Sequence, residues 1–223
     1  MNSKKALVVL SGGQDSTTCL YWALREFGSD KVSSLSFDYG QRHRIELESA
    51  AKVASLAGVS NTVLPIDTLS VLGGNALTDD LQLSADTNKG LPNTFVPGRN
   101  LIFLTYAAAF AYQRGMTDIV TGVAQTDYSG YPDCRQGTIE ALEKAIQLGM
   151  EFDTSIHTPL MNLSKAETVV LAQDVGAMAA MAYTHTCYEG AQPPCGNCAA
   201  CKLRAKGFAE ADVEDPLLVR YTK

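Results

Sequence analysis

Short aliphatic runs alternate with amphipathic segments along most of the chain. The run from Lys4 to Leu10 has aliphatic residues in succession, which is typical of a strand covered on both faces of a parallel sheet. From Asp15 to Phe27, apolar residues recur at helical spacing, and Gly28 follows as a helix stop. The order of strand, glycine turn and helix therefore predicts the first unit of an α/β sheet.

The same alternation predicts further elements along the chain. Crossover units indicate parallel strands, so we expect one open parallel sheet with helices on both faces. The regular pattern fades after Gly176, and we expect an α/β domain over residues 1–180 and a small C-terminal segment over 181–223. The expected strands are 32–37, 61–66, 118–122 and 157–160, and the expected helices are 45–57, 101–115, 138–148 and one that begins at the capping-box pattern of Ser164 and Glu167.

A long irregular excursion interrupts this alternation between Asp67 and Pro97. Glycine, asparagine, aspartate and threonine are frequent in it, and it contains two prolines. Long loops in compact domains are usually functional. We therefore expect this segment to serve as a lid over a binding site.

The composition favours an enzyme that acts on small solutes. The 223 residues carry 18 Lys and Arg against 24 Asp and Glu, a net charge of −6, whereas non-specific polyanion binding needs a basic surface. The apolar run Ala6–Leu10 is too short for a secretion signal, and the apolar segment Leu101–Tyr112 is shorter than the roughly 20 residues of a membrane-spanning helix. We expect a cytoplasmic protein with no membrane or nucleic-acid partner.

A glycine turn with the sequence SGGQDS, from Ser11 to Ser16, joins the first strand to the first helix. Backbone N–H groups at a helix N-terminus attract anions, glycines permit close approach, and serine hydroxyls donate hydrogen bonds to phosphate oxygens. The chain has no Gly-Lys pair and no G-x-G-x-x-G after Leu10, which excludes a Walker loop and the usual dinucleotide fingerprint. An ordinary turn capped by Asp15 or Ser16 is the structural alternative.

The string SGGxDS resembles the pyrophosphate loop of the ATP pyrophosphatase (PP-loop) family, whose members adenylate a substrate oxygen and release pyrophosphate. The resemblance implies a Rossmann-like fold of the adenine nucleotide alpha-hydrolase type. It also implies that Asp15 holds Mg²⁺ or orders the loop, and that Asp15 and Ser16 act at the reacting phosphates. The expected ATP contacts in the loop are Leu10, Ser11, Gly12, Gly13, Gln14, Asp15 and Ser16.

Other polar segments follow predicted strands at the carboxyl edge, where open parallel sheets bind ligands. DYGQRH (38–43) follows the second strand, GYPDCR (130–135) lies beyond the fourth, and VPGRN (96–100) precedes the apolar helix. Each alone has a structural alternative: Asp38 as a helix cap, His43 as a surface histidine and GYPDC as a turn. Together they form the ring of donors, acceptors and aromatic faces that a flat polar heterocycle needs.

These segments and the cysteines near the C-terminus jointly resemble the enzyme family that forms 7-cyano-7-deazaguanine, a queuosine precursor. The likeness extends from Leu7 to about Lys206. It implies an ATP-dependent carbon–nitrogen ligase that converts 7-carboxy-7-deazaguanine and ammonia into the nitrile. Because a carboxylate must lose both oxygens to become a nitrile, we expect two cycles of AMP and pyrophosphate formation, with an amide as the midpoint.

The same resemblance implies roles for individual residues. Arg99 and Asn100 would bind the nucleotide or the carboxylate, and Lys165 would neutralise phosphate charge, with a solvated lysine on a capped turn as its alternative. His43 or Asp133 would deprotonate ammonium, and free ammonium is the simplest source of nitrogen. The expected contacts with the deazapurine are Tyr39, Gln41, Arg42, His43, Asp127, Tyr131 and Asp133.

Four cysteines near the C-terminus form a candidate metal site. Cys187, Cys195, Cys198 and Cys201 are separated by seven, two and two residues, with prolines and a glycine as turn formers between them. Four thiolates fit one structural, tetrahedral Zn²⁺ per subunit with no open coordination position. An iron–sulfur cluster also takes four cysteines, whereas disulfides would need an oxidising compartment.

Two other functions stay open from the sequence. A PP-loop enzyme that adenylates tRNA would use the same ATP chemistry, although the acidic charge balance disfavours it. A non-catalytic zinc module that binds nucleic acid would need more basic residues than Lys202, Arg204 and Lys206 near the cysteines. We also expect a homodimer, because two-fold dimers are the commonest assemblies.

Overall fold

The structure is a computed structural model that describes residues 4–41, 43–79, 81–82, 91–125 and 130–222. The expected substrate contacts Arg42 and Asp127 lie outside these residues. Five parallel strands form one sheet in the order β3-β2-β1-β4-β5, which confirms the predicted open parallel sheet. The strands are β1 (Ala6–Val9), β2 (Val32–Asp38), β3 (Asn61–Pro65), β4 (Asp118–Val120) and β5 (Ser155–His157).

The strand order reverses beside β1. The chain places β2 and β3 on one side of β1 and then returns to place β4 and β5 on the other. Ligands of such sheets bind beyond the carboxyl ends of the strands at the reversal, which here are β1 and β4. Strand β5 ends at His157 rather than spanning 157–160, because Pro159 has no N–H group for a ladder hydrogen bond.

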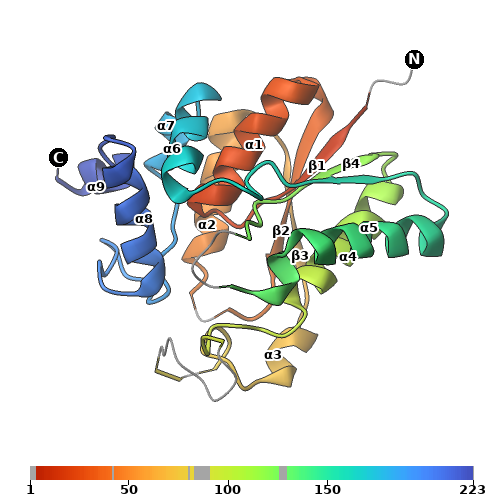
Figure 1. The fold of residues 1–223 in the computed structure, drawn as a ribbon, viewed down its shortest axis with the longest axis horizontal. Helices are drawn as coiled ribbons and strands as arrows, with labels where there is room; N and C mark the ends of the chain where they lie inside the picture. The colour runs from red at the N-terminus through yellow and green to blue at the C-terminus, as the bar shows by residue number, and fades with distance from the viewer. Residues whose placement is uncertain (1–3, 42, 80, 83–90, 126–129, 223) are drawn as a thin grey trace.

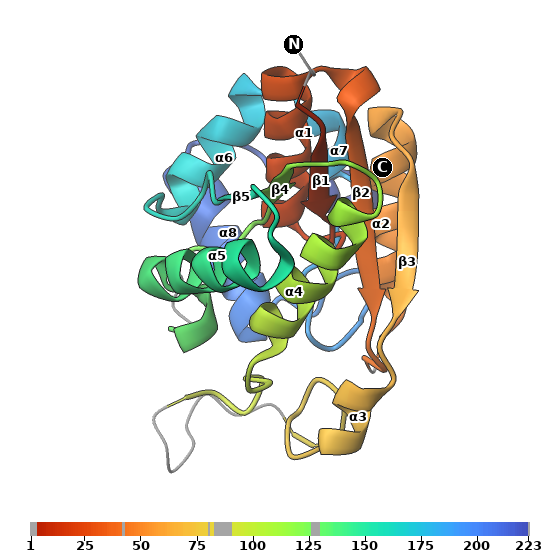
Figure 2. The same ribbon diagram turned by 90° about the vertical axis from the view of Figure 1, so that its right-hand side faces the viewer.

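Helices cover both faces of the sheet (Figures 1 and 2). The side chains of β1 alternate between two cores, with Ala6 and Val8 facing α1 and α2 and Leu7 facing α4. No helix within the described residues is long and apolar enough to cross a bilayer. One face carries α1 (Gln14–Phe27), α2 (Ile45–Ala57), α6 (Lys165–Asp174) and α7 (Met178–Met181), the other carries α4 (Arg99–Tyr112) and α5 (Gln136–Met150), and short 3-10 turns occupy Ser29–Lys31 and Pro132–Cys134.

In its described residues, the excursion between β3 and α4 contains one short helix, α3 (Thr68–Leu72), followed by an ordered turn. In this turn Asn75 Oδ1 accepts hydrogen bonds from the backbone N–H groups of Leu77 and Thr78, both at 3.1 Å. Such side-chain bonding replaces regular secondary structure. Residues 83–90 of the excursion lie outside the described residues, and its role as a lid stays a prediction.

The C-terminal residues fold into two helices, α8 (Ala199–Glu210) and α9 (Pro216–Thr222), which the fading sequence pattern after Gly176 did not predict. A buried ion pair joins them, because Arg204 Nε and Nη2 donate to the two carboxylate oxygens of Asp215 at 2.6 and 2.7 Å. The only large apolar residue among those buried from α8 is Phe208. Its hydrophobic pattern is therefore weak, although α8 packs beside α6 (Figure 1).

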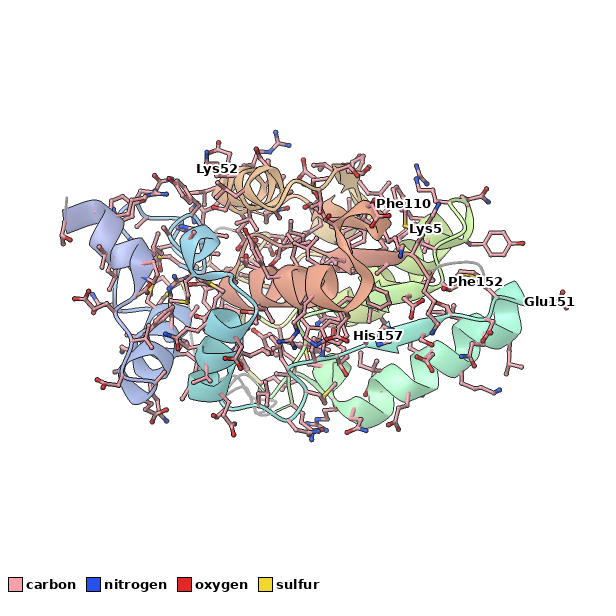
Figure 3. All side chains as sticks on the ribbon, turned by 90° about the horizontal axis from the view of Figure 1, so that it is seen from above. Lys5, Lys52, Phe110, Glu151, Phe152 and His157 are labelled. Atoms are coloured by element: carbon pink, nitrogen blue, oxygen red, sulfur yellow. The ribbon has the colours of Figure 1, made fainter. Side chains whose placement is uncertain are left out.

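The two edges of the sheet lie toward different ends of the molecule. Figure 3 shows Lys5 and Phe152 at the end remote from α8 and α9. At this amino edge, the buried carboxylate of Asp118 lies 2.8 Å from His157 Nε2 and 3.6 Å from Lys4 Nζ. The carboxyl edge, where the predicted site residues gather, lies toward the C-terminal helices (Figure 1).

Candidate active site

The glycine turn after β1 has a conformation that side chains would prevent. Gly12 has a φ of +82°, and a Cβ atom there would lie 2.6 Å from the backbone nitrogen of Ala50 in α2. The loop therefore packs directly against the first turns of α2. Gly13 is the N-cap of α1 and provides no side-chain cap, so the first N–H groups of the helix are left for a ligand.

Two serine hydroxyls fix this loop. Ser11 Oγ and Ser16 Oγ lie 3.0 Å apart, and Ser16 Oγ donates to the carbonyl oxygen of Gly13 at 3.2 Å. Ser16 Oγ also accepts a hydrogen bond from the Ser11 N–H group at 3.2 Å. Because the two ends of the loop share one hydroxyl, its shape is set before any ligand binds.

Three buried polar atoms at the loop have no hydrogen-bond partner among the described residues: Gln14 Nε2, Asp15 Oδ1 and Thr17 Oγ1. Buried polar groups in folded proteins are nearly always hydrogen-bonded, so such a cluster indicates a ligand. The cluster offers an amide donor, a hydroxyl and a carboxylate oxygen. This combination fits a phosphate group with an associated divalent cation.

The loop lies at the strand reversal. A Cβ atom at Gly122, just beyond β4, would lie 3.0 Å from backbone atoms of Asp15 and Ser16. Glycine at this position therefore lets the turn after β1 pass close to the end of β4. The observed site thus occupies the edge that the strand order favours for ligands.

Lys165 reaches the loop from a distant part of the sequence. Its Nζ donates to Asp15 Oδ2 at 2.6 Å, and its side chain is only 11% exposed. The capping box expected at the start of α6 is confirmed, since the Ser164 side chain accepts from Glu167 N–H and the Glu167 carboxylate accepts from Ser164 N–H. A Cβ atom at Gly207 would lie 2.8 Å from Lys165 Cβ, so α8 presses on this lysine. The alternative of a solvated lysine is therefore excluded.

A small cavity beside the loop collects residues from three distant segments. Its volume is about 10 Å³, the space that one water-sized molecule occupies. The end of β2 and the start of α2 supply Tyr39, Gln41, His43 and Glu46, the excursion supplies Ala76 and Leu77, and the C-terminal segment supplies Cys187 and Tyr188.

Gln41 and His43 line this cavity in different ways. The Gln41 amide bonds to the backbone, with Oε1 accepting from Tyr39 N–H at 2.9 Å and Nε2 donating to Phe37 O at 3.3 Å. The His43 ring lies against the backbone of Gly190, and its buried Nε2 has no hydrogen-bond partner in the part of the chain that the structure describes. Gln41 therefore shapes the turn, whereas His43 offers a nitrogen to a ligand.

Arg99, the first residue of α4, lies among tyrosine rings. Its guanidinium carbon is 5.9 Å from the centre of the Tyr39 ring. Burial raises the pKa of Tyr39 to about 12, against the opposing charge of Arg99. Burial alone would lower the pKa of Arg99, but the neighbouring tyrosines and Asp133 raise it above its ordinary value. The guanidinium is therefore a permanent cation that can hold a carboxylate or phosphate.

The 130–135 segment holds the start of α4. Asp133 is 4% exposed, and its Oδ2 accepts a hydrogen bond from the Asn100 N–H group at 3.0 Å. Asn100 Nδ2 donates to Cys134 Sγ at 3.3 Å. The Tyr131 hydroxyl lies 2.6 Å from Thr94 Oγ1. These contacts fix the position of Arg99 relative to the tyrosines.

The four expected metal ligands meet at one point. Their Sγ atoms all lie within 4.8 Å of one another, and tetrahedral Zn–S bonds of ~2.3 Å would place them about 3.8 Å apart. Backbone N–H groups of Cys195, Cys198 and Cys201 each donate to a neighbouring sulfur at 3.4 Å. Hydrogen bonds from Cys201 lower the pKa of Cys198 to about 4 despite burial. The group, completed by Cys187, therefore fits a single tetrahedral metal ion.

The segment that carries the first of these cysteines also supports the glycine loop. The His185 N–H group donates to the carbonyl oxygen of Gly12 at 2.9 Å. Thr186 Cγ2 lies 3.4 Å from the position of a Cβ atom at Gly13. Cys187 and the residue after it then reach the cavity. The cysteine cluster is thus connected to the site through its own chain.

Most of the predicted site residues fall into three neighbouring groups. The first group consists of loop residues 10–16 and Lys165, which bonds to Asp15. The second group lines the small cavity, and the third surrounds Arg99. The second group contains Tyr39, Gln41 and His43, and the third contains Asn100, Tyr131 and Asp133.

Glu46 and Tyr188 line the cavity although the sequence analysis did not identify them. Glu46 lies in the first turn of α2, like the exposed Glu48, and no local pattern in the sequence distinguishes the two. Tyr188 is next to a metal ligand, but no local pattern indicates its approach to Tyr39.

The sequence matches the family model of queuosine biosynthesis protein QueC over residues 5–212. It is 67% identical over 222 residues to a 7-cyano-7-deazaguanine synthase of Chromobacterium violaceum, covering 98% of this chain and 95% of that protein. It is 68% identical over 219 residues to a protein of the same name from Laribacter hongkongensis, covering 96% and 94%. A crystal structure of a predicted tRNA methyltransferase subunit from Methanocaldococcus jannaschii aligns with a TM-score of 0.50 and 16% identity, covering 76% and 74%, which shows the fold alone.

Proposed function

The chain belongs to the QueC family of queuosine biosynthesis proteins, and we propose that it is an ATP-dependent carbon–nitrogen ligase that converts 7-carboxy-7-deazaguanine and ammonia into 7-cyano-7-deazaguanine. The observation that carries this proposal is the glycine loop at the strand reversal. There Asp15 and Lys165 meet beside buried polar groups that have no partner among the described residues. A site of this kind suits phosphate chemistry.

The glycine loop forms the ATP site in this proposal. Residues 10–16 bind the β- and γ-phosphates that leave as pyrophosphate, through N–H groups at the start of α1 and the two serine hydroxyls. Asp15 Oδ1, which is buried and without a partner among the described residues, would hold Mg²⁺, and Mg²⁺ supplies charge neutralisation when bound. Lys165 adds positive charge at the same carboxylate.

The second and third groups of site residues, at the small cavity and around Arg99, form the deazapurine site. Arg99 binds the carboxylate of the substrate or the nucleotide, because its guanidinium stays charged beside aromatic faces. Tyr39, Tyr131 and His43 then contact the flat heterocycle, while Asp133 and Asn100 hold Arg99 in position. Contacts from Arg42 and Asp127 stay predictions.

The reaction requires no protein nucleophile. A substrate carboxylate oxygen attacks the α-phosphorus of ATP, which releases pyrophosphate and turns that oxygen into a leaving group. Ammonia then displaces AMP and forms the amide. A second round activates the amide oxygen, and loss of AMP with the N–H protons forms the nitrile. The site must position the reactants and exclude water from the hydrolysable adenylate.

The four-cysteine cluster holds structural zinc in this proposal. Four protein thiolates leave no open coordination position, so the metal ties the C-terminal segment to the site rather than acting on substrate. Zinc is favoured over an iron–sulfur cluster because the four sulfurs converge on one centre. A homodimer in the cytoplasm stays a prediction.

A single incubation tests the proposed activity. The purified protein is mixed with ATP, Mg²⁺, ammonium and 7-carboxy-7-deazaguanine, and the products are analysed by mass spectrometry and nucleotide chromatography. We expect the nitrile, with AMP and pyrophosphate as the nucleotide products. Accumulation of ADP, or adenylation of tRNA with no reaction of the free deazapurine, would contradict the proposal.

A further inference from the structure

The reaction needs a place for ammonia, and the small cavity beside the glycine loop has features that fit one. Glu46 lines this cavity from the first turn of α2. Its backbone carbonyl packs against Gly12, so this residue connects the cavity with the loop. Its carboxylate forms no hydrogen bond or ion pair with any described residue, and Arg99 is the charged group that acts on it.

The size and the polar lining of the cavity limit what it can hold. A volume of about 10 Å³ admits one water-sized molecule and excludes a hydrated divalent cation. The Glu46 carboxylate is an acceptor, and the buried His43 Nε2 also accepts when the ring proton is on Nδ1. Tyr39 and Tyr188 also line the cavity, and aromatic rings attract cations. An occupant with only N–H donors and one positive charge satisfies all of these groups.

We propose that this cavity is the ammonium-binding site of the enzyme and that the Glu46 carboxylate accepts the proton that makes ammonium nucleophilic. This inference rests on the proposed function, because it concerns the amine donor of that reaction. It assigns the base to Glu46 rather than to Asp133, whose carboxylate already accepts a hydrogen bond at the start of α4. His43 binds the same ion as an acceptor.

One proton moves from ammonium to the Glu46 carboxylate, which leaves neutral ammonia. The nitrogen lone pair attacks the acyl carbon of the adenylate, the bond from that carbon to the AMP oxygen breaks, and AMP leaves with the electron pair. The protonated amide then loses one proton to solvent, and Glu46 returns its own proton to solvent.

The charge environment of Glu46 suits this role near neutral pH. Burial raises the pKa of Glu46 to about 7, and the Arg99 charge limits the rise. Among the described residues, the titratable groups that line the cavity with it are Tyr39, His43, Cys187 and Tyr188. Because the folded-state pKa lies above the ordinary value, the carboxylate becomes charged as the pH passes upward through about 7, and ammonium binding should strengthen over the same range.

The Glu46→Gln variant tests the inference, with Glu48→Gln as its control. Gln preserves the shape of Glu46 and removes only its charge, whereas Glu48 is exposed on the same helical turn. We expect Glu46→Gln to lower kcat/KM for ammonium by about 100-fold and to lose the rise in rate near pH 7. Substrate-dependent exchange of labelled pyrophosphate into ATP, which needs adenylation but no ammonia, should stay close to that of the native protein. Glu48→Gln should match the native protein in both assays.

The outcomes separate this inference from the proposed function. If the native protein shows neither exchange nor nitrile formation, the proposed function fails. If the native protein forms the nitrile but Glu46→Gln keeps the native kcat/KM for ammonium and the native pH profile, the ammonium site is contradicted. Loss of exchange and of the ammonium step together would place Glu46 in adenylation and would also overturn the inference. Equal melting temperatures of the variant and the native protein show that folding is not the cause.

Discussion

The glycine loop and the cysteine module contribute to the same site in opposite ways. The loop, residues 11–16, is held mainly by local bonds, because its serine hydroxyls bond within it, and Gly12 in addition packs against α2. The cysteine module, residues 185–215, depends on distant contacts. Within the module, the Arg204 side chain of α8 bonds to Asp215, just before α9. The His185 N–H group bonds the module to the carbonyl oxygen of Gly12 in the loop.

This difference shows where the geometry of the site originates. The serine hydrogen bonds of the loop lie within residues 11–16, whereas the small cavity exists only when the module has folded against α2 and α6. Lys165 lies between the two regions, because α6 carries it to Asp15 while α8 presses on it at Gly207. We therefore expect changes in the loop to affect ATP chemistry and changes in the module to affect the amine step and stability.

The largest effect should come from Gly12→Ala. The added Cβ atom would meet the α2 backbone, with Ala50 N at 2.6 Å, and a positive φ costs alanine roughly 1–2 kcal/mol in addition. We expect loss of measurable nitrile formation and a lower melting temperature. Gly13→Ala is the matched control for stability, because its Cβ atom would meet Thr186 Cγ2 at an ordinary 3.4 Å. Equal melting temperatures of the two variants would contradict the tight contact between the loop and α2.

The next effect should come from Lys165→Met, which removes the charge beside Asp15 and keeps most of the side-chain volume. We expect kcat/KM for ATP to fall by about 10²–10³-fold, because this cation stabilises charge that develops on the phosphates. Lys206→Met on α8 is the control, since its side chain is 67% exposed and pairs with Glu210 at 3.7 Å. Steady-state kinetics should give Lys206→Met the native kcat/KM for ATP. A native kcat/KM for Lys165→Met would show that this lysine does not act at the ATP site.

Removal of the proposed zinc should loosen the contact between the module and the loop. We expect chelation to lower nitrile formation by about 10–100-fold, because the cavity wall loses its anchor. The chain has three histidines, and NMR can follow each of them. The signals of His43 and His185, which contact the 187–190 turn, should shift, whereas that of His157, which is paired with Asp118, should not. Unchanged His43 and His185 signals in the metal-free protein would show that the module does not shape the site.

The smallest effect on activity, but a large one on stability, should come from Arg204→Met. This change leaves Asp215 buried without its ion-pair partner, and breaking such a pair costs about 3–5 kcal/mol. Lys206→Met should cost only about 0.3–0.5 kcal/mol, because its ion pair is exposed. Urea denaturation compares the two variants. Similar unfolding free energies would mean that the buried pair does not hold α8 and α9 together.

The features that the sequence could predict are those encoded in adjacent residues. Strands β1 and β2, helix α1, the capping box at Ser164 and the glycine loop all depend on short patterns, and the structure has them. The cysteine spacing likewise indicated a common centre before the sulfurs were seen to converge. Such patterns are reliable because their physical cause, a cap, a stop or a metal ligand, acts within a few residues.

The features that the sequence could not predict depend on contacts between distant segments. Helix α8 has few buried apolar residues, so its place is set by Arg204 and by the close approach at Gly207 rather than by an amphipathic face. Glu46 has no distinctive local pattern until the cavity is assembled around it. Tertiary contacts of this kind override or supplement local preference.

The fate of the carboxylate oxygens tests the central claim most directly. The substrate carboxylate is labelled with ¹⁸O at both positions, and the AMP and pyrophosphate from nitrile formation are examined by mass spectrometry. If each oxygen in turn is adenylated at the glycine loop, two AMP molecules form per nitrile, each AMP carries one label and pyrophosphate carries none. Label in pyrophosphate or inorganic phosphate would contradict the account. Unlabelled AMP, with the label recovered in water, would contradict it as well.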